Sequence, residues 1–167
     1  MINNKKIVIL NGTNEEDILC FVDCAFKASE NIVYHSILDA VKHIAHLAQV
    51  GYPSDDSGRN QKLIDELVDA FDTFSDLSFT RFKEILSGFY MLDDLDHLFI
   101  YTKYPDLEKK FVNYAHEMKY NIQTLFIESN KEKTCLSDES SFDRIISNNG
   151  SIEDLMDATI KYICTNA

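Results

Sequence analysis

The sequence has no tryptophan, only two prolines and five glycines, and far fewer basic than acidic residues. Its 16 lysines and arginines stand against 28 aspartates and glutamates, which gives a net charge of -12 at pH 7. Nucleic-acid duplexes bind proteins through neutralisation of their phosphates by a basic surface. This charge balance therefore excludes a duplex as the expected partner, and it disfavours anionic membranes for the same reason.

Long apolar runs are also missing, because no stretch approaches the roughly 18 residues that a membrane span needs. There is no N-terminal signal pattern either, so we expect a cytosolic protein without a membrane partner. The four cysteines, Cys20, Cys24, Cys135 and Cys164, show no C-x-x-C spacing. Cys20 and Cys24 are one helical turn apart and are expected to pack as small buried residues rather than to hold a metal.

The pattern of apolar residues predicts a single α/β domain. At 167 residues and 45% apolar content, the chain has the size and composition of one globular domain. Strands are predicted at 6–10, 31–35, 97–102, 121–128 and 142–147, and helices at 15–27, 36–48, 62–74, 80–92, 105–118 and 151–163. Because strands alternate with helices, we predict a three-layer α/β sandwich around a five-stranded parallel sheet.

In such a sheet, ligands bind beyond the carboxyl ends of the strands. The loops that follow Leu10, His35, Thr102 and Glu128 therefore define the candidate site. The first of them is the most informative, because a buried strand runs into Asn-Gly-Thr, as it does at the start of a phosphate-binding loop.

Several segments, taken in order, resemble the deoxynucleoside monophosphate kinases of phages and low-GC bacteria, a branch of the P-loop kinases. These segments are 6–12, 36–42, 55–59, 98–105, 137–138 and 142–151. The resemblance covers most of the chain and implies one P-loop nucleotide-kinase-like domain, 1–167, with a helical insertion at about 54–93 and a lid at about 129–141. It also implies a nucleoside monophosphate as the ligand.

Carried over position by position, the resemblance implies that Asp39 and Arg59 lie near the acceptor nucleotide. Lys103 stands where the family has the arginine of an Arg-Glu-Pro triplet, and lysine keeps the charge but lacks the two-pronged guanidinium. The lid offers only Lys131 and Lys133. The predicted nucleotide- or anion-binding residues are thus Gly12, Asp39, Arg59, Lys103, Lys131 and Lys133, with no catalytic residue and no metal ligand.

The first loop departs from the phosphate-binding pattern G-x-x-x-x-G-K-[ST]. Counted from Gly12, the second glycine, the lysine and the hydroxyl residue are replaced by Asp17, Ile18 and Leu19. The segment 13–16 is instead typical of a capping box, in which Thr13 and Glu16 cap the next helix. Each carboxylate at 15–17 would cost a bound triphosphate about 1 kcal/mol or more at near-surface dielectric. We therefore predict that triphosphate binding in the usual pose is lost.

Three functions stay open on these residues. The favoured one is a catalytically impaired nucleotide-kinase-like protein, a pseudoenzyme that binds a nucleotide or small anion without phosphoryl transfer and without a cofactor. The second is an active nucleoside monophosphate kinase with an atypical donor loop, which would use Mg-ATP and charge from Lys131 or Lys133. The third is a protein-interaction module or homodimer that uses the aromatic segment 71–90, where Phe79 and Tyr90 could reach a partner.

Overall fold

The computed structural model describes residues 5–37, 39, 66–70, 76–129, 142–148 and 151–165. Its strands are β1 (Lys6–Gly12), β2 (Ile32–Ser36), β3 (His97–Tyr101), β4 (Ile122–Ser129) and β5 (Arg144–Asn148). Its helices include α1 (Glu15–Ala28), α4 (Leu77–Met91), α5 (Pro105–Glu117) and α6 (Ile152–Thr165). Residues 66–70 of the predicted helix 62–74 are helical, whereas most of the predicted helix 36–48 and the lid segment 130–141 lie outside the described residues.

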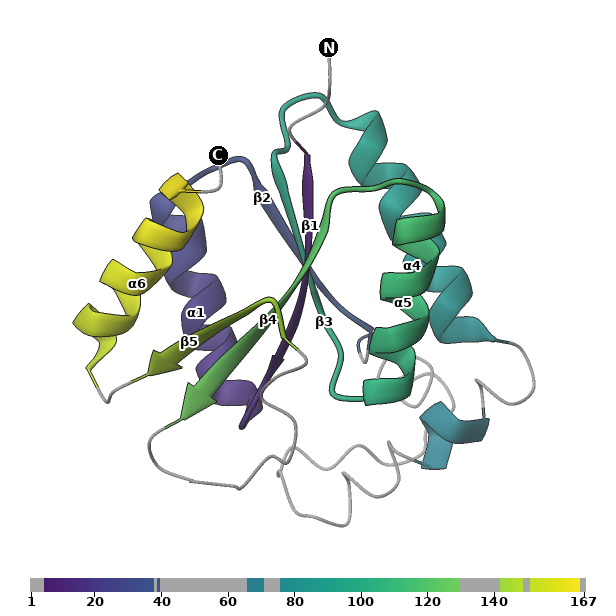
Figure 1. Ribbon diagram of the computed structural model, residues 1–167, viewed down its shortest axis with the longest axis horizontal. Helices are drawn as coiled ribbons and strands as arrows, with labels where there is room; N and C mark the ends of the chain where they lie inside the picture. Colours follow the sequence, from purple (N-terminus) through teal and green to yellow (C-terminus); the bar gives the residue numbers. More distant parts are fainter. Residues whose placement is uncertain are drawn as a thin grey trace.

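The five strands form one parallel sheet in the order β2-β3-β1-β4-β5. Helices α1 and α6 pack together on one face, and α4 and α5 pack together on the other. In Figure 1 the sheet lies between these two helical layers, with the amino ends of the strands at the top. The predicted three-layer α/β sandwich with a five-stranded parallel sheet is therefore confirmed.

The two central strands are apolar because both of their faces are covered. All five residues of β3 are buried, as are the first five of β1, and an uninterrupted apolar run is what a strand covered on both sides requires. The edge strand β5 is partly exposed. The apolar sequences of β1 and β3 are thus consistent with their positions inside the sheet.

Each helical layer is packed on the sheet through aromatic rings. On the α1 face, the Phe21 ring lies edge-on to Phe99 with centroids 5.5 Å apart. On the other face, the rings of Phe82 and Phe111 stack at 4.2 Å and join α4 to α5. Full burial of a side chain of this kind stabilises the fold by roughly 1.5–3 kcal/mol.

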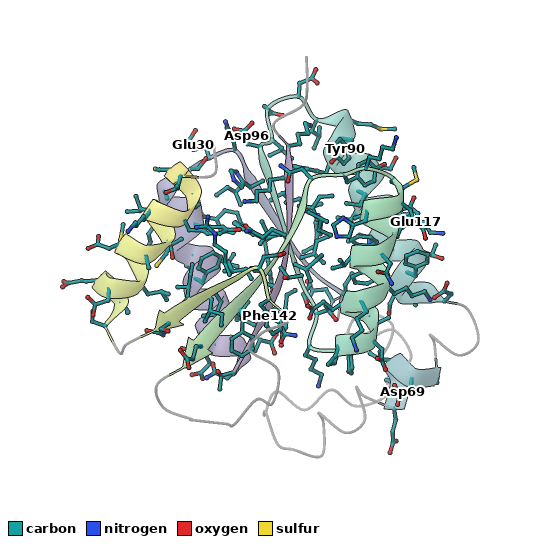
Figure 2. The ribbon with its side chains drawn as sticks, viewed as in Figure 1. Glu30, Asp69, Tyr90, Asp96, Glu117 and Phe142 are labelled. Carbon is teal, nitrogen blue, oxygen red and sulfur yellow. The ribbon has the colours of Figure 1, made fainter. Side chains whose placement is uncertain are left out.

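Phe79 and Tyr90, the two residues of segment 71–90 that were expected to reach a partner, contact other aromatic rings of the same chain. Phe79 is partly buried against the core, with Phe111 stacked on it and Tyr114 edge-on at 5.3 Å. Tyr90, labelled in Figure 2 at the end of α4, stacks on Tyr120 at 4.6 Å. These rings thus fill space between elements of one chain.

Some boundaries and burial states differ from the sequence-based expectation. Helix α4 begins at Leu77, three residues before the predicted start at residue 80, and its N-cap residue Asp76 is left-handed with φ 49°. Cys24 is buried as expected, but Cys20 is exposed. The α1 surface that carries Cys20 faces away from the sheet, and the sequence period alone did not separate the two cysteines.

Lys5 ties the beginning of β1 to the end of α4. Its ammonium donates hydrogen bonds to the carbonyls of Phe89, at 2.8 Å, and Leu92, and it lies 4.9 Å from the centre of the Phe89 ring. Helix α4 has no basic residue in its own last turn. The positive charge that complements the carbonyl end of this helix therefore comes from Lys5, the residue just before β1.

We expect Lys5→Met to lower the free energy of unfolding by about 1–3 kcal/mol, because the variant leaves the carbonyls at the end of α4 without their donor. Chemical denaturation measures the change. Lys109→Met is the matched control, since Lys109 is exposed on α5, and it should change stability by less than about 0.5 kcal/mol. Equal stabilities of the two variants would contradict the capping role of Lys5.

Candidate functional site

The strand order predicts a crevice at the carboxyl ends of β1 and β3. From β1 the chain crosses through α1 to β2, and from β3 it crosses through α5 to β4 on the opposite side of β1. Because such crossovers are right-handed, the loops after these two neighbouring strands leave toward opposite faces of the sheet. This is the switch point at which open α/β sheets bind their ligands.

A hydrogen bond between Asn11 and Glu108 spans this crevice on the α5 side. The Asn11 side-chain amide donates to the Glu108 carboxylate at 3.0 Å. Burial raises the pKa of the Glu108 carboxyl, and the bond from Asn11 and the charge of Lys109 only partly offset it. A half-buried carboxyl with a perturbed pKa in a crevice is a common mark of a functional site.

The end of β1 does not curl into a phosphate-binding loop. The strand stays paired with β4 through Gly12, which lies opposite Ile127. The Gly12 N–H donates to the Asn11 side chain at 2.8 Å, and the Thr13 N–H donates to the Ile127 carbonyl at 3.1 Å. In a phosphate-binding loop such N–H groups point at the ligand, whereas here the protein itself accepts their hydrogen bonds.

The predicted capping box of Thr13 and Glu16 is wrong, because Asn14 caps α1. The Asn14 side-chain oxygen accepts from the Asp17 N–H at 2.9 Å, and its amide donates to the Asp17 carboxylate at 2.8 Å. The shift has a physical reason: β1 continues through Gly12 and the Thr13 N–H still donates to β4, so the cap lies one residue further on, at a residue type equally suited to it.

Asp17 also joins the first helix to the last strand. Its second carboxylate oxygen accepts from the Asn148 side-chain amide at 2.8 Å, at the carboxyl end of β5. The residue that stands in the place of the loop's second glycine therefore links three segments of the chain.

Gly12 is required by packing. A Cβ atom at this position would lie 2.8 Å from the Ile127 carbonyl oxygen and 3.0 Å from the Ile18 side chain. The first of these contacts is with backbone, which cannot move aside without breaking the pairing of β1 with β4. The glycine at the strand end is thus explained by the sheet, without a phosphate.

On the α1 side of the crevice, two tyrosines lie in the field of Glu15. Burial, followed by the negative charge of Glu15, raises the pKa of Tyr101 to about 12. Burial also raises the pKa of Tyr34, with Asp39 and Glu15 adding to the effect and a hydrogen bond with Ser36 opposing it. Both phenols therefore keep their protons at neutral pH, so they can act as hydrogen-bond donors.

Three of the six predicted binding residues come to the same edge of the sheet. Gly12 ends β1, Asp39 follows β2, and Lys103 follows β3, and these strands are neighbours. The Lys103 ammonium lies 5.2 Å from the centre of the Tyr104 ring. Arg59, Lys131 and Lys133 lie outside the described residues. Within the described residues, no group of His, Cys, Asp or Glu is arranged to hold a metal ion.

The crevice also contains residues that the sequence analysis missed. Asn11 was assigned to a turn, and Glu108 and Tyr101 were assigned only to a helix and a strand. Their positions in the sequence could have pointed to the site, since Glu108 lies in the first turn of the helix that follows β3 and Asn11 lies next to the end of β1. The pairing of these two side chains across the crevice follows from the strand order, which the sequence does not state.

Comparison with known proteins does not assign the chain to a family: no family model matches it, and no curated protein is found as a relative. Among the described residues, no helix is both long and apolar enough to cross a membrane. A function must therefore be argued from the crevice itself.

Gly12→Ala should destabilise the protein by about 1–3 kcal/mol, because the added methyl group overlaps the Ile127 carbonyl. Gly88→Ala is the matched control: nothing lies within 4 Å of the added methyl group in α4, so this change should stabilise the protein by about 0.5–1 kcal/mol. Thermal and denaturant unfolding measure both. Similar effects of the two variants would disprove the packing role of Gly12.

Glu108→Gln should stabilise the protein at pH 7 by up to about 1 kcal/mol, because it removes a charge whose burial is unfavourable and keeps an acceptor for Asn11. A carboxyl with a raised pKa in the folded state destabilises that state as the pH rises through the folded pKa. The gain should therefore shrink as the pH falls toward about 4. A pH series of denaturation curves measures it, and a constant difference between variant and wild type would refute the explanation.

Proposed function

We propose that this chain is a nucleotide-kinase-like pseudoenzyme: it binds a nucleoside monophosphate at the carboxyl edge of the sheet and transfers no phosphoryl group. The observation that carries the proposal is the state of the first loop. The N–H groups of Gly12, Thr13 and Asp17 donate to acceptors of the protein itself. These three N–H groups are therefore not available to a triphosphate.

Electrostatics at the start of α1 support the same conclusion. The first turn of the helix carries Glu15, Glu16 and Asp17. A helix N-terminus attracts anions only when its partial positive charge is available, and here three carboxylates complement it. An active kinase with an atypical donor loop would have to bind Mg-ATP against this charge, so the structure favours the pseudoenzyme over that alternative.

The acceptor side of the crevice keeps groups that suit a nucleotide. The resemblance assigns Asp39, Arg59 and Lys103 to this side, with Lys131 and Lys133 in the lid. The phenols of Tyr34 and Tyr101 are protonated donors near Glu15, and donors and acceptors placed together in a crevice are what orient a polar ligand. No specific observation among the described residues favours a protein-interaction function over this one.

Calorimetric titration with the four deoxynucleoside monophosphates, and separately with Mg-ATP, tests the proposal. We expect at least one monophosphate to bind and Mg-ATP to give no heat. A coupled assay with both present should show no turnover. Mg-ATP binding with phosphoryl transfer would refute the pseudoenzyme, and the absence of any monophosphate binding would refute the retained site.

The residue-level test is Lys103→Met. Loss of a cation that contacts a phosphate should weaken monophosphate binding about tenfold or more. Lys109→Met removes an exposed charge on the following helix and should leave the affinity within about twofold, since an exposed charge contributes little. Equal affinities of the two variants would remove Lys103 from the site.

A further inference from the structure

A buried histidine at the opposite, amino edge of the sheet has no hydrogen-bond partner. His97 begins β3, and only 2% of it is exposed. Within the described residues, neither of its ring nitrogens has a partner, and both are shielded from solvent. Buried polar groups without a partner are rare in folded proteins, because burying them is costly. The preceding residue, Asp96, is labelled at this edge in Figure 2.

The neighbour of His97 on the same face of the sheet is a buried lysine. Lys6 in β1 is the register partner of His97 and is 6% exposed. Its ammonium lies 5.3 Å from the centre of the Tyr162 ring of α6. No carboxylate of the described residues forms an ion pair with it. Two nitrogen-bearing side chains therefore share one poorly solvated space.

Few charged groups surround His97 and Lys6, and the two carboxylates among them already accept hydrogen bonds from other residues. Asp96 precedes β3, but its carboxylate already accepts from the Asn31 side chain at 3.0 Å. Asp143 and Arg144, at the start of β5, act on Lys6 with opposite signs. One oxygen of Asp143 accepts from the Thr124 N–H at 2.7 Å and from its hydroxyl at 3.0 Å.

These surroundings keep His97 neutral. Burial first, and then the positive charge of Lys6, lower the pKa of His97, while Asp96 opposes them. In the unfolded chain a histidine titrates near about pH 6.5. A histidine whose pKa is lowered by folding stabilises the fold above that value, and the stabilisation is lost as the pH falls below it.

Aromatic rings connect His97 to helices α1 and α6. His97 stacks on Phe99, whose ring contacts Phe21 of α1, and Phe21 contacts Tyr162 of α6 at 6.2 Å. Helix α1 packs on β1, β2 and β4 as well as on α6, whereas α6 packs on α1 and β5. Movement of α6 would therefore expose Lys6 while α1 keeps its packing on β1, β2 and β4, and it would break the hydrogen bond that the Tyr162 hydroxyl donates to the Gln123 side chain of β4 at 2.8 Å.

We propose that His97 and Lys6 form an acid-sensitive latch: when His97 gains a proton, α6 lifts from the sheet and both cations become solvated. The proton supplies a second positive charge beside Lys6, and both side chains are buried. Separation of α6 removes Tyr162 from above Lys6 and admits solvent. The latch acts at the amino edge, at the end of the sheet opposite the crevice, and does not depend on the proposed nucleotide site.

Hydrogen exchange followed by mass spectrometry tests the latch on the full chain, at about pH 7.5 and about pH 5.5 and with correction for intrinsic rates. Below about pH 6.5, protection of α6 should fall by up to about tenfold per pH unit relative to α5. In His97→Phe, which keeps an aromatic ring of similar size but cannot gain a proton, α6 should stay protected at both pH values. Equal loss of protection in all helices would overturn the proposal.

Two further variants make the test specific. Lys6→Met should weaken the acid response of α6, because it removes the like charge beside His97. His116→Phe, at an exposed position near the end of α5, should respond as the wild type does. If His97→Phe does not fold, an NMR pH titration of the His97 ring in the wild-type protein tests the latch instead. Protonation without any change in the α6 signals would overturn the latch, and protonation coupled to loss of those signals would support it.

Discussion

The structure around the first loop depends on one constraint: β1 remains hydrogen-bonded to β4 through Gly12. A strand that stays straight to that point cannot curl its backbone around an anion. Its last N–H groups go to Asn11 and to the Ile127 carbonyl, and the closeness of that carbonyl leaves room for glycine alone. The start of α1, its Asn14 cap and the link from Asp17 to β5 follow from where this strand ends.

The two edges of the sheet place polar groups in unfavourable surroundings for different reasons. At the carboxyl edge, Glu108 and the two tyrosines have pKa values raised by burial, yet each has a polar or charged neighbour that a ligand could share. At the amino edge, the ring nitrogens of His97 have no hydrogen-bond partner within the described residues, and its register partner is the cation Lys6. Burial without compensation destabilises a fold, and such groups are commonly kept where a site or a conformational change uses them. The crevice and the latch are the two proposals that this reasoning supports.

Sequence reasoning anticipated the elements better than their ends. The five strands and the helices that flank them were predicted because β-branched runs and helical periods are local signals. The cap of α1 was misplaced by one residue because Thr13 and Asn14 are both good caps, and only the length of β1 selects between them. Among the candidate site residues, Asp39 and Lys103, which the resemblance implied, lie just after β2 and β3, at the carboxyl edge of the sheet. The pairing of Asn11 with Glu108 was not predicted, because it joins residues far apart in the chain.

The sequence by itself determined the α/β class, the apolar runs of the buried strands and the absence of the G-x-x-x-x-G-K-[ST] pattern after the first strand, since each depends on residue types and their spacing along the chain. The tertiary structure alone decided the strand order, and with it which loops meet. It also decided that Gly12 is held by the Ile127 carbonyl and that Lys6 lies beside His97. These are contacts between distant segments, whose geometry is set by the packing of the whole sheet and not by any local preference of the residues involved.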